Sequence, residues 1–204
     1  MIYDISMIIH PKMMVYKNKE EKYPKIKQVN FFEKEGNYES ELTMNLHTGT
    51  HIDFPLHMIK DGSNSNTENL DTLIGKAKVF DVTHLKEKIT SEDIKDFQIE
   101  TNDFIIFKTK NSLSEKFDYD FIYLEESGAS YLANKKVRGV GIDALGIERA
   151  QANHPTHKIL LSSNIIILEG LRLKEVPEDT YELFCLPLKI ANVEALPVRA
   201  ILIK

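Results

Sequence analysis

The stretch HTGTHIDFPLH, residues 47–57, holds three of the seven histidines of the chain and one aspartate. From Leu42 to Leu56 the even positions are apolar or threonine, whereas the histidines and the aspartate of residues 47–57 all fall on odd positions. Side chains of an extended chain alternate between two faces. The pattern therefore predicts a strand that buries one face in the core and projects three imidazoles and a carboxylate from the other.

The same residues suggest a metal site. A helix would also bring His47 and His51 together, but Gly49 and Pro55 disfavour helix interiors, so we favour an extended chain that bends at these two residues. Imidazole and carboxylate together form the ligand set of Zn²⁺, Mn²⁺ or Fe²⁺. The alternatives are a polar strand that faces solvent and a purely structural metal site. Structural zinc usually has four ligands, often cysteines, and the single cysteine, Cys185, is far away in the sequence.

The composition is that of an ordinary globular chain. Its 204 residues, 42% of them hydrophobic, are typical of one domain, so we predict a single domain over residues 1–204. Lys and Arg number 26 against 31 Asp and Glu, without a basic block, which argues against nucleic-acid binding. No apolar run reaches the roughly 18 residues of a membrane span, and no signal peptide is apparent at the start. One cysteine excludes an internal disulfide and favours a cytoplasmic location.

Strand signals outnumber helix signals along the chain. We expect strands in short runs of β-branched or aromatic residues, namely Ile2–Ile9, Val79–Thr83, Phe104–Thr109, Val137–Ile142, Ile165–Leu168 and Val198–Ile203. We expect helices from Ser91, within Tyr123–Lys135 and within Thr156–Ser163. Residues 104–168 then alternate between strand and helix, as in a crossover unit. The predicted fold class is α/β, with a mixed, β-rich core and flanking helices.

Several other features receive an interpretation. The Lys- and Glu-rich stretch Lys17–Lys27 is predicted to be an exposed loop, although it could form a lid over an acidic substrate. His10 and His84 have no supporting pattern, and we interpret them as surface residues. His154 is interpreted as non-functional, with support of a neighbouring ligand as the alternative. Asp143 ends a predicted strand and could orient a metal ligand.

Residues 47–57 resemble the signature H-x-G-T-H-x-D-x-P-x-H of the metal-dependent cyclase family, which includes bacterial kynurenine formamidase and isatin hydrolase. The resemblance extends in order along nearly the whole chain. The further segments that carry it are Asp4-Ile5-Ser6, Leu73-Ile74-Gly75, Ala77-Lys78-Val79, Gly141-Ile142-Asp143, His154-Pro155-Thr156-His157, Leu168-Glu169-Gly170-Leu171, Leu186-Pro187-Leu188-Lys189 and Pro197-Val198-Arg199-Ala200.

The resemblance implies a centre of two divalent cations per subunit, most simply Zn²⁺ or Mn²⁺. His47, His51 and Asp53 would hold the first cation. Asp53 would bridge to a second cation held by His157 and Glu169. The resemblance also implies the swivelling β/β/α-type cyclase fold, association into a homodimer or homotetramer, and a small-molecule amide as the binding partner.

The activity that the resemblance implies is that of an arylformamidase, which converts N-formylkynurenine and water into kynurenine and formate by means of a metal-activated bridging water. His57 would be the general acid/base. Kynurenine formamidases tend to carry a Trp-Pro-Gly-Asp-like stretch near the start, whereas this chain has Tyr16 in that region without the Pro-Gly-Asp turn. Tyr16 could bind the substrate ring in place of tryptophan. The alternatives are a hydrolase of a cyclic amide or imide such as isatin, and a non-catalytic, metal-dependent binding protein on the same fold.

Overall fold

A single β-sheet closes on itself into a barrel in the computed structural model, which describes residues 1–67 and 69–204. Within these residues the strand order is β1-β12-β11-β5-β7-β9-β10-β4, and β4 also pairs with β12, which completes the ring. The strands are β1 (Ile2–Asp4), β4 (His51–Asp53), β5 (Ile74–Asp81), β7 (Phe104–Lys108), β9 (Gly139–Ile142), β10 (Ile166–Glu169), β11 (Asp179–Pro187) and β12 (Ala195–Ile203).

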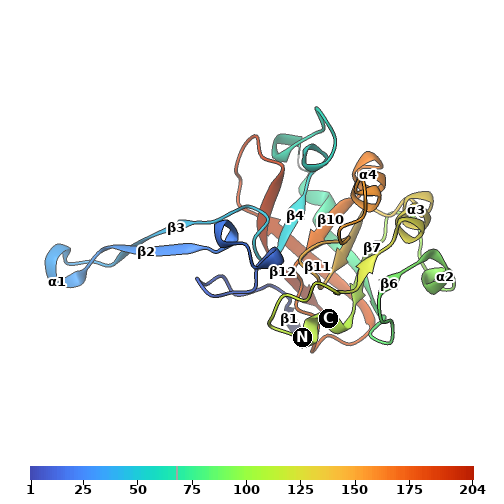
Figure 1. Cartoon of the computed structure of the whole chain (residues 1–204), viewed down its shortest axis with the longest axis horizontal. Coiled ribbons are helices and arrows are strands. Elements are labelled where there is room, and N and C mark those ends of the chain that lie inside the picture. The colour runs from blue at the N-terminus through green and yellow to red at the C-terminus, as the bar shows by residue number, and fades with distance from the viewer. Residues whose placement is uncertain (68) are drawn as a thin grey trace.

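Half of the barrel wall is parallel and carries the helices. Strands β5, β7, β9 and β10 pair in parallel, as crossover connections require. The helices α2 (Ser91–Ile94), α3 (Glu126–Lys135) and α4 (Pro155–Ser162) gather on one side of the sheet (Figure 1). The side chains of β7 alternate between two hydrophobic clusters. Ile105 and Phe107 pack in the cluster that contains residues of α3 and α4. Phe104 and Ile106 belong to the second cluster. Both faces of this strand are therefore buried.

The remaining elements are short. Strands β6 (Lys88–Ile89) and β8 (Tyr123–Leu124) form a separate two-stranded pair. Six single turns of 3-10 helix are η1 (Tyr16–Asn18), η2 (Glu20–Lys22), η3 (Pro55–His57), η4 (Ser65–Thr67), η5 (Leu70–Thr72) and η6 (Lys110–Leu113). Among the described residues, no helix has the length and apolar character needed to cross a lipid bilayer.

A hairpin arm projects from the barrel (Figure 1). It consists of β2 (Lys25–Asn30), α1 (Phe32–Glu35) and β3 (Glu39–Thr43). β2 and β3 pair with each other in a sheet of their own, and every β3 side chain is exposed. The prediction of a loop over Lys17–Lys27 is therefore wrong at the end of this stretch, because β2 begins at Lys25. The short turns η1 and η2 occupy much of residues 17–24. The buried position expected for Leu42 is also wrong, because Leu42 lies on the arm and is 55% exposed.

The other sequence predictions match the structure more closely. All six predicted strands are present in whole or in part, and the three predicted helices are present as α2, α3 and α4. The sequence reasoning missed β6, β8 and β11, and the start of the helical segment predicted from Tyr123 is the strand β8, because α3 begins only at Glu126. The sequence reasoning also placed the cap of α2 one residue late, because Thr90 and Asp93 form the capping box.

Two glycines allow the segment before β4 and the segment after β10 to meet. Gly49 and Gly170 both have positive φ, +77° and +71°. A Cβ atom on Gly170 would lie 2.4 Å from the carbonyl oxygen of Gly49, which no side chain can occupy without moving the backbone. The two segments therefore meet backbone to backbone, immediately beside His51 and Glu169.

We predict that Gly170→Ala destabilises the protein much more than Gly36→Ala. Gly36 has a φ of +74° but nothing within 4 Å of a Cβ atom, so this matched control measures the left-handed backbone alone, about 1–2 kcal/mol or less. Gly170→Ala adds the clash with Gly49. Urea unfolding of both variants measures the difference, and equal free energies of unfolding would show that the close approach is unimportant.

Candidate metal centre and active site

Strand β4 places two of the predicted residues on one face of the sheet. In the antiparallel pair of β4 and β10, His51 lies directly opposite Glu169 and Ile52 lies opposite Leu168. Asp53 follows His51 by two residues and therefore shares its face, whereas the Ile52 side chain is fully buried in the core on the other face. The two-residue period of the sequence thus corresponds to the actual division between site and core along β4.

Three imidazoles meet these carboxylates. His51 Nε2 lies 3.5 Å from Asp53 Oδ1 and 3.4 Å from Glu169 Oε2. His157, in the first turn of α4, brings its Nε2 to 3.8 Å from Asp53 Oδ2 and 3.5 Å from Glu169 Oε1. His47, in the turn before β4, brings its Nδ1 to 3.0 Å from Asp53 Oδ1. Residues that are far apart in the sequence, 47–53 and 157–169, therefore converge on one centre.

Each histidine has its other ring nitrogen beside an acceptor outside the centre. His51 Nδ1 lies 3.0 Å from the carbonyl oxygen of Gly49. His157 Nδ1 lies 2.7 Å from Glu148 Oε1, and His47 Nε2 lies 3.3 Å from Glu194 Oε1. A hydrogen bond at one imidazole nitrogen assigns the proton to that nitrogen and leaves the other free to bind a metal. The ring nitrogens that are not held in this way are the three that face Asp53 and Glu169.

Glu148 is a residue that the sequence reasoning missed. It is 2% exposed and lies in an irregular segment before α4. Its Oε2 accepts a hydrogen bond from the backbone N–H of Thr156, while its Oε1 lies 3.0 Å from His154 Nδ1 as well as close to His157. Nothing in the local sequence distinguishes it from a surface glutamate. His154 thus touches the support of a predicted ligand, which was the alternative to its non-functional interpretation.

The charges of the centre depend on one another. Burial opposes ionisation of Glu169, but contacts with His157 and His51 hold the pKa of Glu169 well below its usual range. Burial and the charge of Glu169 oppose ionisation of Asp53, and His47 and His51 nevertheless lower the pKa of Asp53. Burial favours neutral His157, yet Glu148 and Glu169 raise the pKa of His157 to about 10. The carboxylates are therefore ionised and require positive charge beside them.

The donor set fits a divalent cation. His51 Nε2 and both carboxylate oxygens of Asp53 are buried without a hydrogen-bond partner, and such unsatisfied polar atoms are costly unless something else binds them. The donor atoms lie 3.0–3.8 Å apart. This spacing is close to the separation of about 3.3 Å between ligands at tetrahedral Zn²⁺ with bonds near 2.0–2.1 Å. Nitrogen and carboxylate donors are also the set that Zn²⁺ and Mn²⁺ accept.

His57 lies beside this centre on η3. Its ring centroid is 4.3 Å from that of His47 and 5.5 Å from that of His157. Burial lowers the pKa of His57, and the neighbouring imidazoles add to this effect, so the ring is neutral near pH 7. Its side chain forms no hydrogen bond within the described part of the chain. A half-buried, neutral imidazole whose ring nitrogens are not engaged in such hydrogen bonds is suited to accept and return a proton.

A cavity of about 190 Å³ opens at the centre, and Tyr16 and Lys22 line it together with His57, His157 and Glu169. The Tyr16 ring packs edge-on against Phe117, with ring centroids 5.2 Å apart. Tyr16 thus lines the cavity from the short turn η1, and its contact with a substrate ring stays a prediction.

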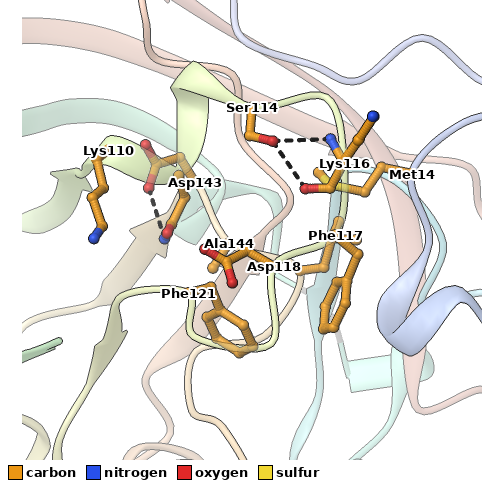
Figure 2. A pocket seen from close by; sticks show the side chains of 11 residues that line it. Met14, Lys110, Ser114, Lys116, Phe117, Asp118, Phe121, Asp143 and Ala144 are labelled. Carbon is orange, nitrogen blue, oxygen red and sulfur yellow. Dashed lines mark hydrogen bonds between the residues drawn. The ribbon is translucent and has the colours of Figure 1, made fainter. Parts of the chain in front are cut away.

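Asp143 does not join the centre. Its carboxylate accepts hydrogen bonds from the backbone N–H groups and hydroxyls of Thr109 and Ser112, and burial raises the pKa of Asp143 to about 6 against these bonds. Asp143 lies at the wall of a second cavity, of about 210 Å³ (Figure 2). There the side-chain amide of Asn111 donates a hydrogen bond of 3.5 Å to Asp143 Oδ1. The contacts of Asp143 join β9 to η6 and are structural. His10 and His84 are exposed, as predicted.

Comparison with known proteins agrees with this geometry. A family model described as "Putative cyclase" matches residues 3–149. A kynurenine formamidase from Salinibacter ruber is 35% identical over 79% of this chain and 77% of its own. A kynurenine formamidase from Bacillus cereus is 32% identical over 79% of this chain and 78% of its own.

Solved structures share the fold over nearly the full length. The structure of a predicted metal-dependent hydrolase from Bacillus stearothermophilus has a TM-score of 0.92 and 49% identity, and the match covers 99% of this chain and 97% of that chain. Isatin hydrolase A from Labrenzia aggregata has a TM-score of 0.87 with coverage of 99% and 93%. At 20% identity this second likeness shows the fold alone.

We predict that Glu148→Gln weakens divalent metal binding about 10- to 100-fold, because an amide no longer holds His157 as a carboxylate does. His154→Ala is the matched control, because His154 contacts the same carboxylate while its side chain is 48% exposed. Metal affinity by competition with a chelator is the measurement. Unchanged affinity in a folded Glu148→Gln protein would remove Glu148 from the support of the centre.

Proposed function

Because this chain belongs to the family described as Putative cyclase, we propose that it is a metal-dependent amide hydrolase of the arylformamidase type. The proposed reaction is hydrolysis of N-formylkynurenine to kynurenine and formate. The relatives named kynurenine formamidase support this substrate. The observation that carries the proposal is the convergence of three imidazoles and two carboxylates at one centre, with the neutral His57 beside it.

We propose that two divalent cations, Zn²⁺ or Mn²⁺, bind to each subunit. His47, His51 and Asp53 would hold one cation, and Asp53, His157 and Glu169 would hold the other. The position of Asp53 supports this division, because its Oδ1 faces His47 and His51 while its Oδ2 faces His157. Bound cations would supply Lewis acidity that activates water and polarises the scissile carbonyl group.

The residues of the chain provide the remaining steps. Water adds to the formyl carbon, the bond between carbon and nitrogen breaks, and formate and the aromatic amine are released. His57 accepts a proton as the water attacks and donates it to the leaving nitrogen, a contribution of typically 10²- to 10⁴-fold. His57 is neutral and its side chain forms no hydrogen bond within the described residues, which supports this role. The same features favour an enzyme over a non-catalytic binding protein on the same fold.

The cavity also bears on the substrate. Tyr16 presents an aromatic ring beside His57 and His157, where it could pack against an aryl group. The absence of the Pro-Gly-Asp turn from this chain makes a cyclic amide such as isatin the second candidate substrate. The similarity to isatin hydrolase A extends over nearly the whole fold and is compatible with both candidate substrates.

We further propose that residues 1–204 form one domain and that the subunits associate into a homodimer or homotetramer in the cytoplasm. The arm supports association, because it carries exposed apolar side chains such as Phe32 and Tyr38. The single cysteine, Cys185, supports a reducing compartment.

We predict that removal of metal abolishes hydrolysis and that added Zn²⁺, Mn²⁺ or Co²⁺ restores it. The measurement is the absorbance change on formation of the amine from N-formylkynurenine, with isatin in a parallel assay and bound metal counted by elemental analysis. Preference for isatin would favour the second candidate. A protein that binds metal yet hydrolyses neither compound would favour the binding protein.

We predict that His57→Ala retains the metal content of the wild type but lowers turnover at least about 100-fold, because a proton-transfer group is lost while the ligands remain. Asp53→Ala is the contrasting variant and should lose both metal and activity, since Asp53 faces all three histidines of the centre. Loss of metal from His57→Ala would instead identify His57 as a ligand, which its closeness to His47 and Asp53 permits.

A further inference from the structure

The cavity beside the metal centre is lined by a lysine that forms no ion pair with any described residue. Lys22, at the end of η2, is half-buried and lines this cavity together with Tyr16, His57 and Glu169. Within residues 1–67 and 69–204, Lys22 forms no ion pair. Its Nζ lies 5.9 Å from the centroid of the Tyr16 ring. A half-buried ammonium group without an ion pair among these residues is unusual, because removing a charge from water is costly.

The other cation at the cavity differs from Lys22 in this respect. Arg149 forms ion pairs with Asp120 at 3.2 Å and with Glu87 at 3.6 Å, and it lies 4.7 Å from the centroid of the Tyr123 ring. Its charge is therefore matched by residues of the chain. Lys22 is left as the cation that can accept an anionic group from a ligand in the cavity.

The backbone holds Lys22 in place. The hydroxyl of Thr48 donates a hydrogen bond of 2.8 Å to the carbonyl oxygen of Lys22, and the N–H of Lys22 donates to the carbonyl oxygen of Lys19. Thr48 adjoins His47, so the turn that carries Lys22 is joined directly to the segment that carries the predicted ligands. The side chain is therefore presented from an anchored turn rather than from a free loop.

Electrostatics agree with this placement. Burial and the charge of Lys19 lower the pKa of Lys22, while Glu169 and Asp53 of the centre and the neighbouring Glu21 oppose that shift. Glu169 and Asp53 are the carboxylates that divalent cations would neutralise under the proposed function. When bound cations neutralise Glu169 and Asp53, the positive charge of Lys22 remains available to attract an anionic group of a substrate.

We infer that Lys22 binds the carboxylate of an anionic aromatic amide, with the Tyr16 ring against its aryl group, so that the substrate class is a formamide that bears a carboxylate and not a neutral cyclic amide. This inference rests on the proposed function and extends it to a residue that determines specificity.

The experiment uses the metal-loaded protein and two substrates that differ in one charge, N-formylkynurenine and its methyl ester. In Lys22→Gln we expect kcat/KM for N-formylkynurenine to fall about 10- to 100-fold through KM, as for loss of a hydrogen bond to a charged group. The value for the ester should change less than about 3-fold. Lys22→Arg should restore most of the loss. Lys19→Gln is the matched control, because Lys19 lies on the same turn, is half exposed and does not line the cavity.

Calorimetric binding of kynurenine and its methyl ester gives a readout that is independent of turnover. Kynurenine should bind Lys22→Gln about 10- to 100-fold more weakly than it binds the wild type, whereas the ester should bind both alike. Equal losses for both compounds, or no loss for either, would overturn the inference. If the wild type binds kynurenine through Lys22 but hydrolyses no amide, the proposed function fails while the assignment of Lys22 stands.

Discussion

Two buried carboxylates, Asp53 and Glu169, constrain the rest of the structure. They are 2% and 3% exposed and share one centre, where like charges repel strongly in a medium of low polarity. They can coexist only if positive charge is brought between them. The closure of the barrel does this, because β4 lies between β10 and β12 and sets His51 directly opposite Glu169. The position of β4 therefore completes the sheet. It also brings Asp53 close to Glu169, so that positive charge is needed between the two carboxylates.

The residues of the metal centre and the residues proposed to face a substrate come from different kinds of structural element. The predicted ligands come from β4, β10, the start of α4 and the turn before β4, and their outer nitrogens are held by Gly49, Glu148 and Glu194. Rigid elements of this kind hold donor atoms to the accuracy that a metal needs. The groups that we propose to face a substrate, Tyr16 and Lys22, line the cavity from the short turns η1 and η2. Such turns tolerate change, so substrate choice can vary while the chemistry is retained.

The predictions from sequence succeeded where the information is local. The two-residue period shows which side chains share a face along β4, although His47 lies in a turn and His57 in η3. The apolar runs of the parallel wall show where its strands lie. Glu148 was missed because it sits in an irregular segment without any period, and only folding brings it to His157. The arm was missed because β2 and β3 are polar and pair only with each other. Closure of the barrel by β12 depends on pairing between distant segments, which no local pattern records.

The pairing of β4 with β12 also has a consequence for biosynthesis. Residues 47–53 leave the ribosome early, whereas the strand that flanks them on one side, Ala195–Ile203, is made much later. Until then β4 has a bare edge, and the segment of His157 and Glu169 has only just been made. A nascent chain therefore offers at most a few loosely held donors to any ion. A cation that uses the whole proposed donor set would therefore bind only after Ala195–Ile203 has been made and the barrel has closed.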